Sequence, residues 1–183
     1  MRRLTAVLLA GCLPFAVTAQ DPASEATRAA QADLAKRLPL NDPRDEANAT
    51  RGKIAEIPGG HIQTADGKTV WDRRPYAFLD AKEAPDTVNP SLWRQARLNA
   101  VHGLFEVAPG SIWQIRGYDL SVMTIIRGKT GWIVVDPLLS EETAAAGWKL
   151  FADTVEAKSG ERPIKAVIFS HSHSDHFGGV GGI

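Results

Sequence analysis

A dense group of potential metal ligands lies near the end of the sequence, at residues 171–176. This segment reads His-Ser-His-Ser-Asp-His and holds three of the five histidines of the chain together with one carboxylate. Imidazole and carboxylate groups are the usual ligands of catalytic zinc, whereas thiolates are scarce here because the chain has one cysteine, Cys12. We therefore interpret the segment as a metal-binding loop that serves hydrolytic chemistry.

The spacing within this loop favours two metal positions. In an extended loop, residues two apart point the same way, so His171 and His173 can hold one ion together. Asp175 and His176 come next and can face a second ion. Two cations about 3.5–4 Å apart stabilise both the attacking and the leaving oxygens of a displacement. The alternative interpretation is a solvated loop or a tag-like run, but this segment has fixed spacers and follows an apolar stretch.

Apolar runs predict the strands that would position the loop. The candidates are Ile112 to Arg116, Val122 to Arg127, Trp132 to Val135 and Ile164 to Phe169. Before the last strand, Ser140 is expected to cap a helix that ends near Gly160. Its expected apolar face consists of Ala145, Trp148, Phe151, Ala152 and Val155. Strands, a helix, a strand and then a polar loop indicate an α/β layered domain with its chemistry at strand ends.

The first half of the chain is more polar and less regular. Helices are expected at Ala23 to Leu38 and at Ser91 to His102, the second one capped by Ser91. We expect residues 20–110 to form an N-terminal extension that packs on a catalytic domain beginning at residues 111–183.

The first nineteen residues have the layout of a secretory signal peptide. A basic start at Arg2 and Arg3 precedes a largely apolar stretch, and small residues at 17–19 allow cleavage after Ala19. This predicts a periplasmic or secreted protein. A lipid anchor at Cys12 is the minor alternative, and a core helix is disfavoured because Pro14 would break it.

The overall composition argues against several kinds of partner. The chain has 21 basic and 21 acidic residues, so its zero net charge gives no footprint for nucleic acid. No apolar run reaches about 18 residues, so no membrane span is expected. A mature chain that begins after Ala19 would have no cysteine and hence no disulfide bond.

The metal motif and the segments around it resemble a known family. His171-x-His173-x-Asp175-His176 is similar to the signature of the metallo-β-lactamase superfamily. The flanking segments resemble one branch of it, the linear alkyl sulfatases; they are Asn89 to Gln95, His102 to Val107, Arg116 to Leu120, Gly131 to Leu138 and Ser170 to Gly179. The resemblance runs over nearly the whole mature chain but covers only the front part of such an enzyme.

The resemblance implies a fold and a set of site residues. The fold would be the first half of a metallo-β-lactamase-like αββα layered domain. His171 and His173 would ligate one zinc ion, and Asp175 and His176 would ligate the other. Asp136 would stand beside the metals and orient a ligand, so we assign Asp175 and Asp136 as the catalytic carboxylates. The alternative for Asp136 is an ordinary turn before Pro137.

The resemblance also implies a function. We expect zinc-dependent hydrolysis of a small-molecule linear alkyl sulfate, such as dodecyl sulfate, to alcohol and sulfate, by an enzyme that is a homodimer at full length. Further ligands would lie beyond Ile183, so we expect the present chain to be truncated and inactive alone. The alternatives are another hydrolase of the same fold, such as a thioesterase or lactamase, and a non-catalytic metal-binding protein.

Overall fold

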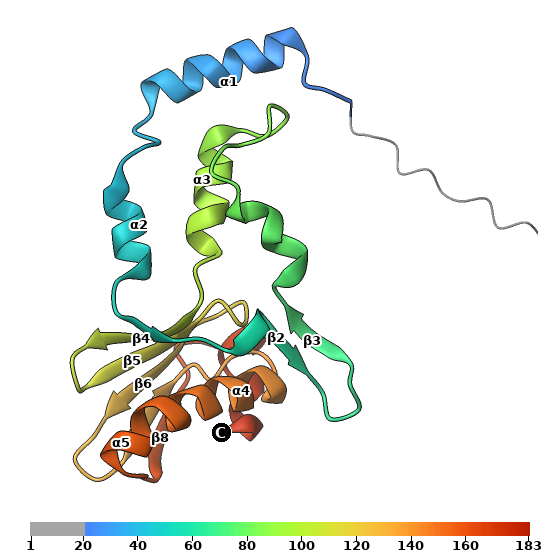
Figure 1. Ribbon diagram of the computed structural model, residues 1–183. Helices are drawn as coiled ribbons and strands as arrows, with labels where there is room; N and C mark the ends of the chain where they lie inside the picture. The colour runs from blue at the N-terminus through green and yellow to red at the C-terminus, as the bar shows by residue number, and fades with distance from the viewer. Residues whose placement is uncertain (1–20) are drawn as a thin grey trace, which may run out of the picture.

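A helical arm stands on a layered α/β body in the computed structural model, which describes residues 21–183 (Figure 1). The expected signal peptide at residues 1–19 and Cys12 lie outside the described residues. The arm contains α1 (Glu25–Arg37), α2 (Pro43–Thr50), the 3₁₀ segment η2 (Arg74–Asp80) and α3 (Pro90–Asn99). Within residues 21–183, no helix combines the length and apolar character needed to cross a bilayer.

The body is built on a six-stranded sheet with the order β1-β4-β5-β6-β7-β8. Its strands are β1 (Lys53–Ala55), β4 (Gly103–Ala108), β5 (Ile112–Arg116), β6 (Met123–Arg127), β7 (Trp132–Val135) and β8 (Ile164–Ile168). The strand predictions for the second half of the chain are thereby confirmed. Neighbours from β1 to β7 are antiparallel, and β8 is parallel to β7. Because β1 and β4 precede residue 110, the sheet extends across the boundary expected there.

A crossover connects the two parallel strands, as parallel pairing requires. It consists of α4 (Glu141–Phe151), a π-helical turn at Ala152–Glu156 and α5 (Ala157–Ser159). Ser140 caps α4 as predicted, and Thr143 completes a reciprocal capping box with it. In the arm, however, the cap of α3 is Asn89 and not Ser91, because the Asn89 side chain accepts hydrogen bonds from the first-turn amides.

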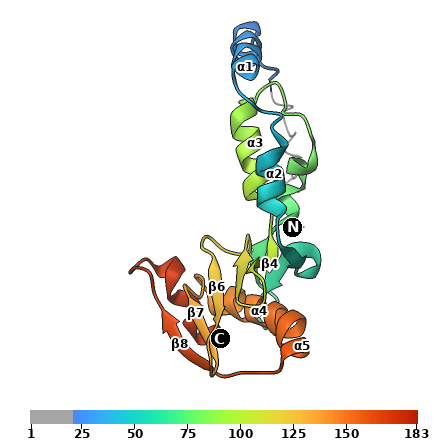
Figure 2. The same cartoon turned by 90° about the vertical axis from the view of Figure 1, so that its left-hand side faces the viewer.

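Helix α4 lies against one face of the sheet (Figure 2). The buried residues of α4 and of the π-helical turn that follows are Thr143, Ala144, Gly147, Phe151, Val155 and Glu156. Three residues predicted on this face are instead exposed or half-buried: Ala145, Trp148 and Ala152. A Cβ atom on Gly147 would lie 3.1 Å from side-chain atoms of Ile115 and Met123. The helix therefore turns its small residues toward the sheet, which lets it approach closely.

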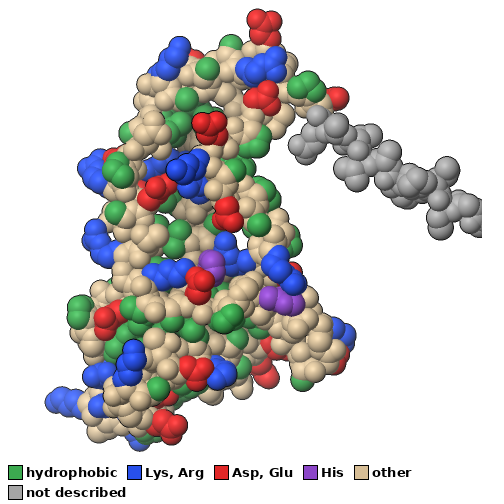
Figure 3. All heavy atoms as spheres, viewed as in Figure 1, with side chains coloured by type: hydrophobic (Ala, Val, Ile, Leu, Met, Phe, Trp, Pro, Cys, Tyr) green, Lys and Arg blue, Asp and Glu red, His purple; other side chains and the backbone are tan. Residues whose placement is uncertain are grey.

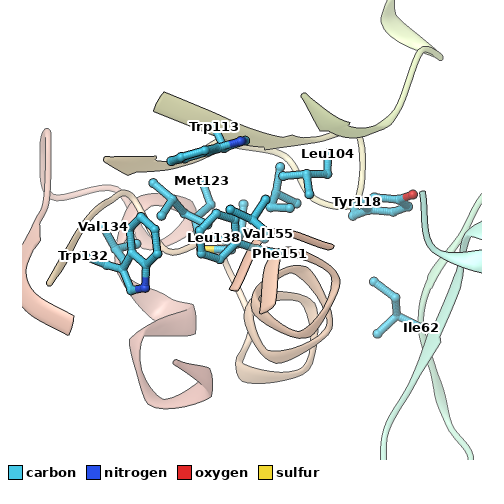
Figure 4. Packing of buried hydrophobic residues seen from close by; sticks show 12 residues of the cluster. Ile62, Leu104, Trp113, Tyr118, Met123, Trp132, Val134, Leu138, Phe151 and Val155 are labelled. Atoms are coloured by element: carbon cyan, nitrogen blue, oxygen red, sulfur yellow. The ribbon is translucent and has the colours of Figure 1, made fainter. Parts of the chain in front are cut away.

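A smaller hairpin completes the body. It pairs β2 (His61–Gln63) with β3 (Thr69–Asp72) in antiparallel fashion and follows the short 3₁₀ turn Pro58–Gly60. Ile62 points from this hairpin toward the main core (Figure 4). The hairpin therefore shares the core of the six-stranded sheet.

Three aromatic rings form the centre of that core (Figure 4). Trp132 meets Phe151 at 5.0 Å and Trp113 at 5.8 Å between ring centroids, in both cases edge to face. The indole N–H of Trp132 donates a 2.5 Å hydrogen bond to the buried carboxylate of Glu156 on the π-helical turn. Trp113 and Trp132 are therefore central residues of the core.

Charged side chains of both signs are mixed over the arm and the body (Figure 3). Within the arm, Arg94 on α3 lies 2.9 Å from Asp45 on α2, and Arg97 lies 3.4 Å from Glu46. Such pairs have solvent-exposed partners and contribute little individually. The arm has few buried side chains, and Trp93 is one of them.

Tyr118 joins the body to the chain that leaves β1. Its phenol oxygen accepts a 2.7 Å hydrogen bond from the Ile57 amide, and burial raises the pKa of Tyr118 to about 12. Since the unfolded phenol titrates near 10, the stabilisation is fully present below pH 10 and is lost between pH 10 and about 12.

We expect the free energy of unfolding to fall more steeply over that alkaline range in the wild type than in Tyr118→Phe. At neutral pH the variant should lose about 1 kcal/mol, because the Ile57 amide loses its acceptor. Urea titrations at a series of pH values measure both effects. Identical pH slopes for the two proteins would contradict the prediction.

Candidate metal centre

The predicted metal-binding loop follows β8 directly, beside the ends of β7 and β8 (Figure 2). It turns through the short 3₁₀ segment Ser174–His176, in which the His176 amide donates to the His173 carbonyl at 3.0 Å. The turn brings the rings together, with centroids 4.7 Å apart for His171 and His173 and 4.0 Å apart for His171 and His176. Three imidazoles that the sequence spreads over six residues thus converge.

The first predicted ligand pair has the separation that a shared ion requires. Nε2 of His171 lies 3.1 Å from Nδ1 of His173. Two nitrogens bound tetrahedrally to zinc, each at 2.0–2.1 Å, lie about 3.3 Å apart. These two side chains therefore fit one zinc ion with small adjustment.

The second predicted pair has a similar separation. Nε2 of His176 lies 3.3 Å from Oδ2 of Asp175. Across residues 21–183, no three His, Cys, Asp or Glu side chains are arranged so that they could hold one metal ion. The donors are therefore present as two pairs, each of which fits part of a zinc coordination sphere in ligand type and spacing.

Asp136 connects β7 to the metal-binding loop. Its carboxylate accepts hydrogen bonds from the Ser170 amide at 2.7 Å and from the Ser170 hydroxyl at 2.6 Å, and it lies 2.8 Å from Nδ1 of His176. Burial is the largest single influence and raises the pKa of Asp136. The hydrogen bonds from Ser170 and His176 act against it, and together they hold the pKa below its usual value.

This contact selects the tautomer of His176. Because the Asp136 carboxylate is ionised and can only accept, the proton of a neutral His176 ring belongs on Nδ1. The lone pair is then on Nε2, the atom that lies beside Asp175. A carboxylate that holds the far nitrogen of a histidine in this way is typical of the groups that orient metal ligands.

The turn that carries Asp136 has an unusual backbone. Asp136 and Leu138 have positive φ angles of 54° and 69°. Residues other than glycine rarely adopt such angles, although Asp does so more readily than most. The Asp136 amide still donates to the Ile168 carbonyl at 3.0 Å. Asp136 therefore forms a strand-end turn and also reaches the metal-binding loop.

One glycine after the motif, Gly179, packs closely against the turn that follows Asp136. A Cβ atom on Gly179 would overlap the Pro137 carbonyl oxygen and would lie 2.6 Å from that of Ser140. The Gly179 amide also donates to the Leu138 carbonyl at 2.9 Å. The absence of side chains thus lets the end of the loop lie against the turn after Asp136.

We expect Gly179→Ala to destabilise the fold by about 1–3 kcal/mol, because backbone atoms must move to admit the new methyl group. Gly181→Ala is the matched control. The nearest atoms to a methyl group at Gly181 would belong to the side chain of Glu141, which can rotate away. Urea unfolding of both variants measures the difference, and equal losses would contradict this explanation.

Two serines near the centre had no role assigned from sequence. Ser170 bonds to Asp136 as described, and the Ser121 hydroxyl donates to the backbone carbonyl of Asp175. The position of Ser170 between a strand and the motif is a weak signal. Nothing in the sequence around Ser121 indicates a contact with residues so far along the chain.

The remaining histidines lie away from this centre. Nε2 of His61 is 3.1 Å from the Thr69 hydroxyl, and the His102 ring packs edge-on against Tyr118 at 5.4 Å. His102 also lines a cleft of about 430 Å³ between the arm and the sheet, and none of the four predicted ligands contributes to it. His61 therefore has a hydrogen-bonding role and His102 a packing role.

Comparisons with known proteins agree with this fold and site. The Metallo-beta-lactamase superfamily model matches residues 116–183, which contain β6, β7, β8 and the metal-binding loop. The chain belongs to this superfamily. Within it, the chain is similar along most or all of its length to part of several alkylsulfatases.

Three curated relatives support the second statement. The chain is 45% identical over 187 residues to the (R)-specific secondary-alkylsulfatase of a Pseudomonas species. The aligned region covers 100% of this chain and 27% of the relative. The chain is 43% identical to a Pseudomonas linear primary-alkylsulfatase, over 98% of this chain and 26% of the relative. It is 45% identical to an alkyl/aryl-sulfatase of Saccharomyces cerevisiae, over 86% of this chain and 24% of the relative.

A solved structure shows the same arrangement. The stereoselective inverting sec-alkylsulfatase Pisa1 from Pseudomonas sp. matches with a TM-score of 0.80 and 48% identity, over 89% of this chain and 25% of that protein. The expected α/β layered fold of the metallo-β-lactamase type is thereby confirmed. The chain spans about a quarter of the length of the relatives it matches.

Proposed function

We propose that this chain is part of a zinc-dependent alkyl sulfatase that hydrolyses linear alkyl sulfate esters to alcohol and sulfate. The observation that carries the proposal is the convergence of two donor pairs after β8, in a chain similar throughout to proteins named alkylsulfatases. The complete enzyme would hold two zinc ions, one at His171 and His173 and the other at Asp175 and His176.

Each residue of the centre has a distinct task in this proposal. The four donors bind and orient the metals, and Asp136 keeps the proton on Nδ1 of His176 so that Nε2 remains free to bind. Bound zinc would supply water of lowered pKa and neutralise charge on the ester. Asp175 and Asp136 are therefore the carboxylates that we assign to catalysis.

Apolar side chains close to the centre suit an alkyl substrate. Phe169 and Phe177 flank the metal motif, are about half exposed, and have ring centroids 6.2 Å apart. Leu139, on the turn after Asp136, is also exposed, and a Cβ atom on Gly178 would overlap its carbonyl oxygen. An apolar surface beside the metal centre would bind the alkyl group of the substrate while the metal centre acts on the sulfate group.

We expect the 183-residue chain alone to have no sulfatase activity. Four donors for two ions leave two protein ligands for each, whereas catalytic zinc ordinarily has about three. We further propose export to the periplasm or medium through residues 1–19, with a lipid anchor at Cys12 as the minor alternative, and a homodimer for the complete protein.

The deciding experiment uses a full-length protein, as long as the relatives, that contains the residues of this chain. We expect it to hydrolyse dodecyl sulfate in preference to a β-lactam or a thioester, to lose activity to a chelator and to regain activity with zinc. Preference for either other substrate would favour a different hydrolase of this superfamily. Absence of retained metal after dialysis would favour a non-catalytic protein.

A further inference from the structure

The loop between β5 and β6, residues 117–122, buries two polar side chains close to the candidate centre. Asp119 and Ser121 are each 8% exposed. Tyr118, between the start of the loop and Asp119, is buried and fixed to the Ile57 amide at 2.7 Å. Polar groups this buried need defined partners, so their hydrogen bonds show what the loop holds.

The carboxylate of Asp119 fixes the loop to the start of α4. Its Oδ2 atom accepts hydrogen bonds from the Leu139 amide at 3.1 Å and from the Thr143 hydroxyl at 2.5 Å. Its Oδ1 atom accepts from the neighbouring Leu120 amide at 2.6 Å. The β5–β6 loop is thereby held in one position relative to the turn that follows Asp136.

The hydroxyl of Ser121 reaches the metal-binding loop from this fixed position. It donates to the backbone carbonyl of Asp175. That carbonyl belongs to the planar peptide unit that joins Asp175 to His176, so its direction sets the relative placement of both residues. The donor atoms of these two side chains are the pair 3.3 Å apart.

We infer that Ser121 is a positioning residue for the Asp175–His176 half of the centre, anchored by Asp119; the metal-binding part of this inference rests on the proposed function. Within the described residues, one hydrogen bond joins the β5–β6 loop to the metal-binding loop, and it ends on Asp175 and not on His171 or His173. Ser121 therefore acts on one ligand pair and not on the other.

Zinc titration of the chain, followed through the separate ring signals of His176 and His171 by NMR, tests this inference. In Ser121→Ala the zinc concentration at the midpoint for His176 should rise about tenfold, the usual effect of removing a group that orients a ligand. The midpoint for His171 should stay unchanged. Ser121→Thr, which keeps the hydroxyl, should restore the His176 midpoint.

A matched control is Ser111→Ala. The Ser111 hydroxyl also donates to a backbone carbonyl, that of Ala108 at 3.3 Å, in the turn that joins β4 and β5. This variant should leave both midpoints unchanged. Equal weakening at both histidines in Ser121→Ala would show a general loss of stability, and no weakening at either would show no positioning role; both outcomes overturn the inference.

A second measurement needs no metal. The amides of His176 and Phe177 donate to the carbonyls of His173 and Ser174 at 3.0 and 3.2 Å, so their hydrogen exchange reports the order of the turn. Ser121→Ala should accelerate exchange at these amides while leaving β6 and β7 protected. Unchanged exchange overturns the inference. A wild type that binds no zinc, with exchange accelerated as expected in the variant, would instead contradict the proposed function and leave the role of Ser121 in place.

Discussion

Replacement of His171 and His173 by alanine is expected to remove zinc from the first metal position and to abolish hydrolysis of dodecyl sulfate in a protein of full length. The two ring nitrogens lie 3.1 Å apart and are the proposed ligands of that position. Metal ions contribute several kcal/mol of transition-state stabilisation, which corresponds to a loss of about a thousandfold or more in rate. Metal analysis and a sulfate-release assay measure the two losses together.

His61→Ala is the matched control for that variant. It removes another histidine that has a single hydrogen bond, to Thr69, and that lies outside the metal-binding loop. Zinc content and activity should both remain at the wild-type level. A protein without His171 and His173 that still consumed the detergent would show that these imidazoles do not carry the chemistry.

The largest expected loss of stability follows from Trp132→Ala. The ring is fully buried between Trp113 and Phe151, and its indole N–H is bonded to the buried carboxylate of Glu156. Removing it leaves a cavity at the centre of the core and takes one donor from a buried acid. We expect the free energy of unfolding to fall by about 3–5 kcal/mol, as measured by urea denaturation.

Trp148→Ala controls for the size of the deleted ring. Trp148 is half-buried on α4 and packs against Phe151 with centroids 5.4 Å apart. Because part of its surface already faces water, its loss should cost clearly less than the loss of Trp132. Similar losses for the two variants would contradict the assignment of Trp132 to the centre of the core.

The second half of the fold was predictable because its signals are local. The apolar runs at 132–135 and 164–168 each have the length of a buried strand, and Ser140 stands where a helix cap is needed. The buried face of the crossover helix was predicted only in part, because hydrophobic periodicity gives weight to large side chains: Phe151 and Val155 are buried, but Trp148 is half-buried. Gly147 faces the sheet because it has no side chain that would keep the helix and the sheet apart, and a pattern of hydrophobic residues does not detect this property.

The candidate site was predictable where its residues form a local motif and, for Asp136, where the family resemblance indicated it. His171, His173, Asp175 and His176 form a motif, and the structure places them together in pairs. The roles of Ser121 and Asp119 depend on contacts between distant parts of the chain. Such contacts exist only after the sheet has formed, so a single sequence carries no local trace of them.

The single parallel pairing of the sheet has a consequence for the order of folding. Strands β4 to β7 follow one another through short connections, so they can associate at small loss of chain entropy. Pairing of β8 with β7 must await closure of the whole crossover that contains α4. Asp136 stands where that crossover begins and His176 lies in the loop that follows β8, so the two residues meet only when β8 has paired with β7. We therefore expect the ligand cluster to assemble late, in the kinetic phase that completes the native state.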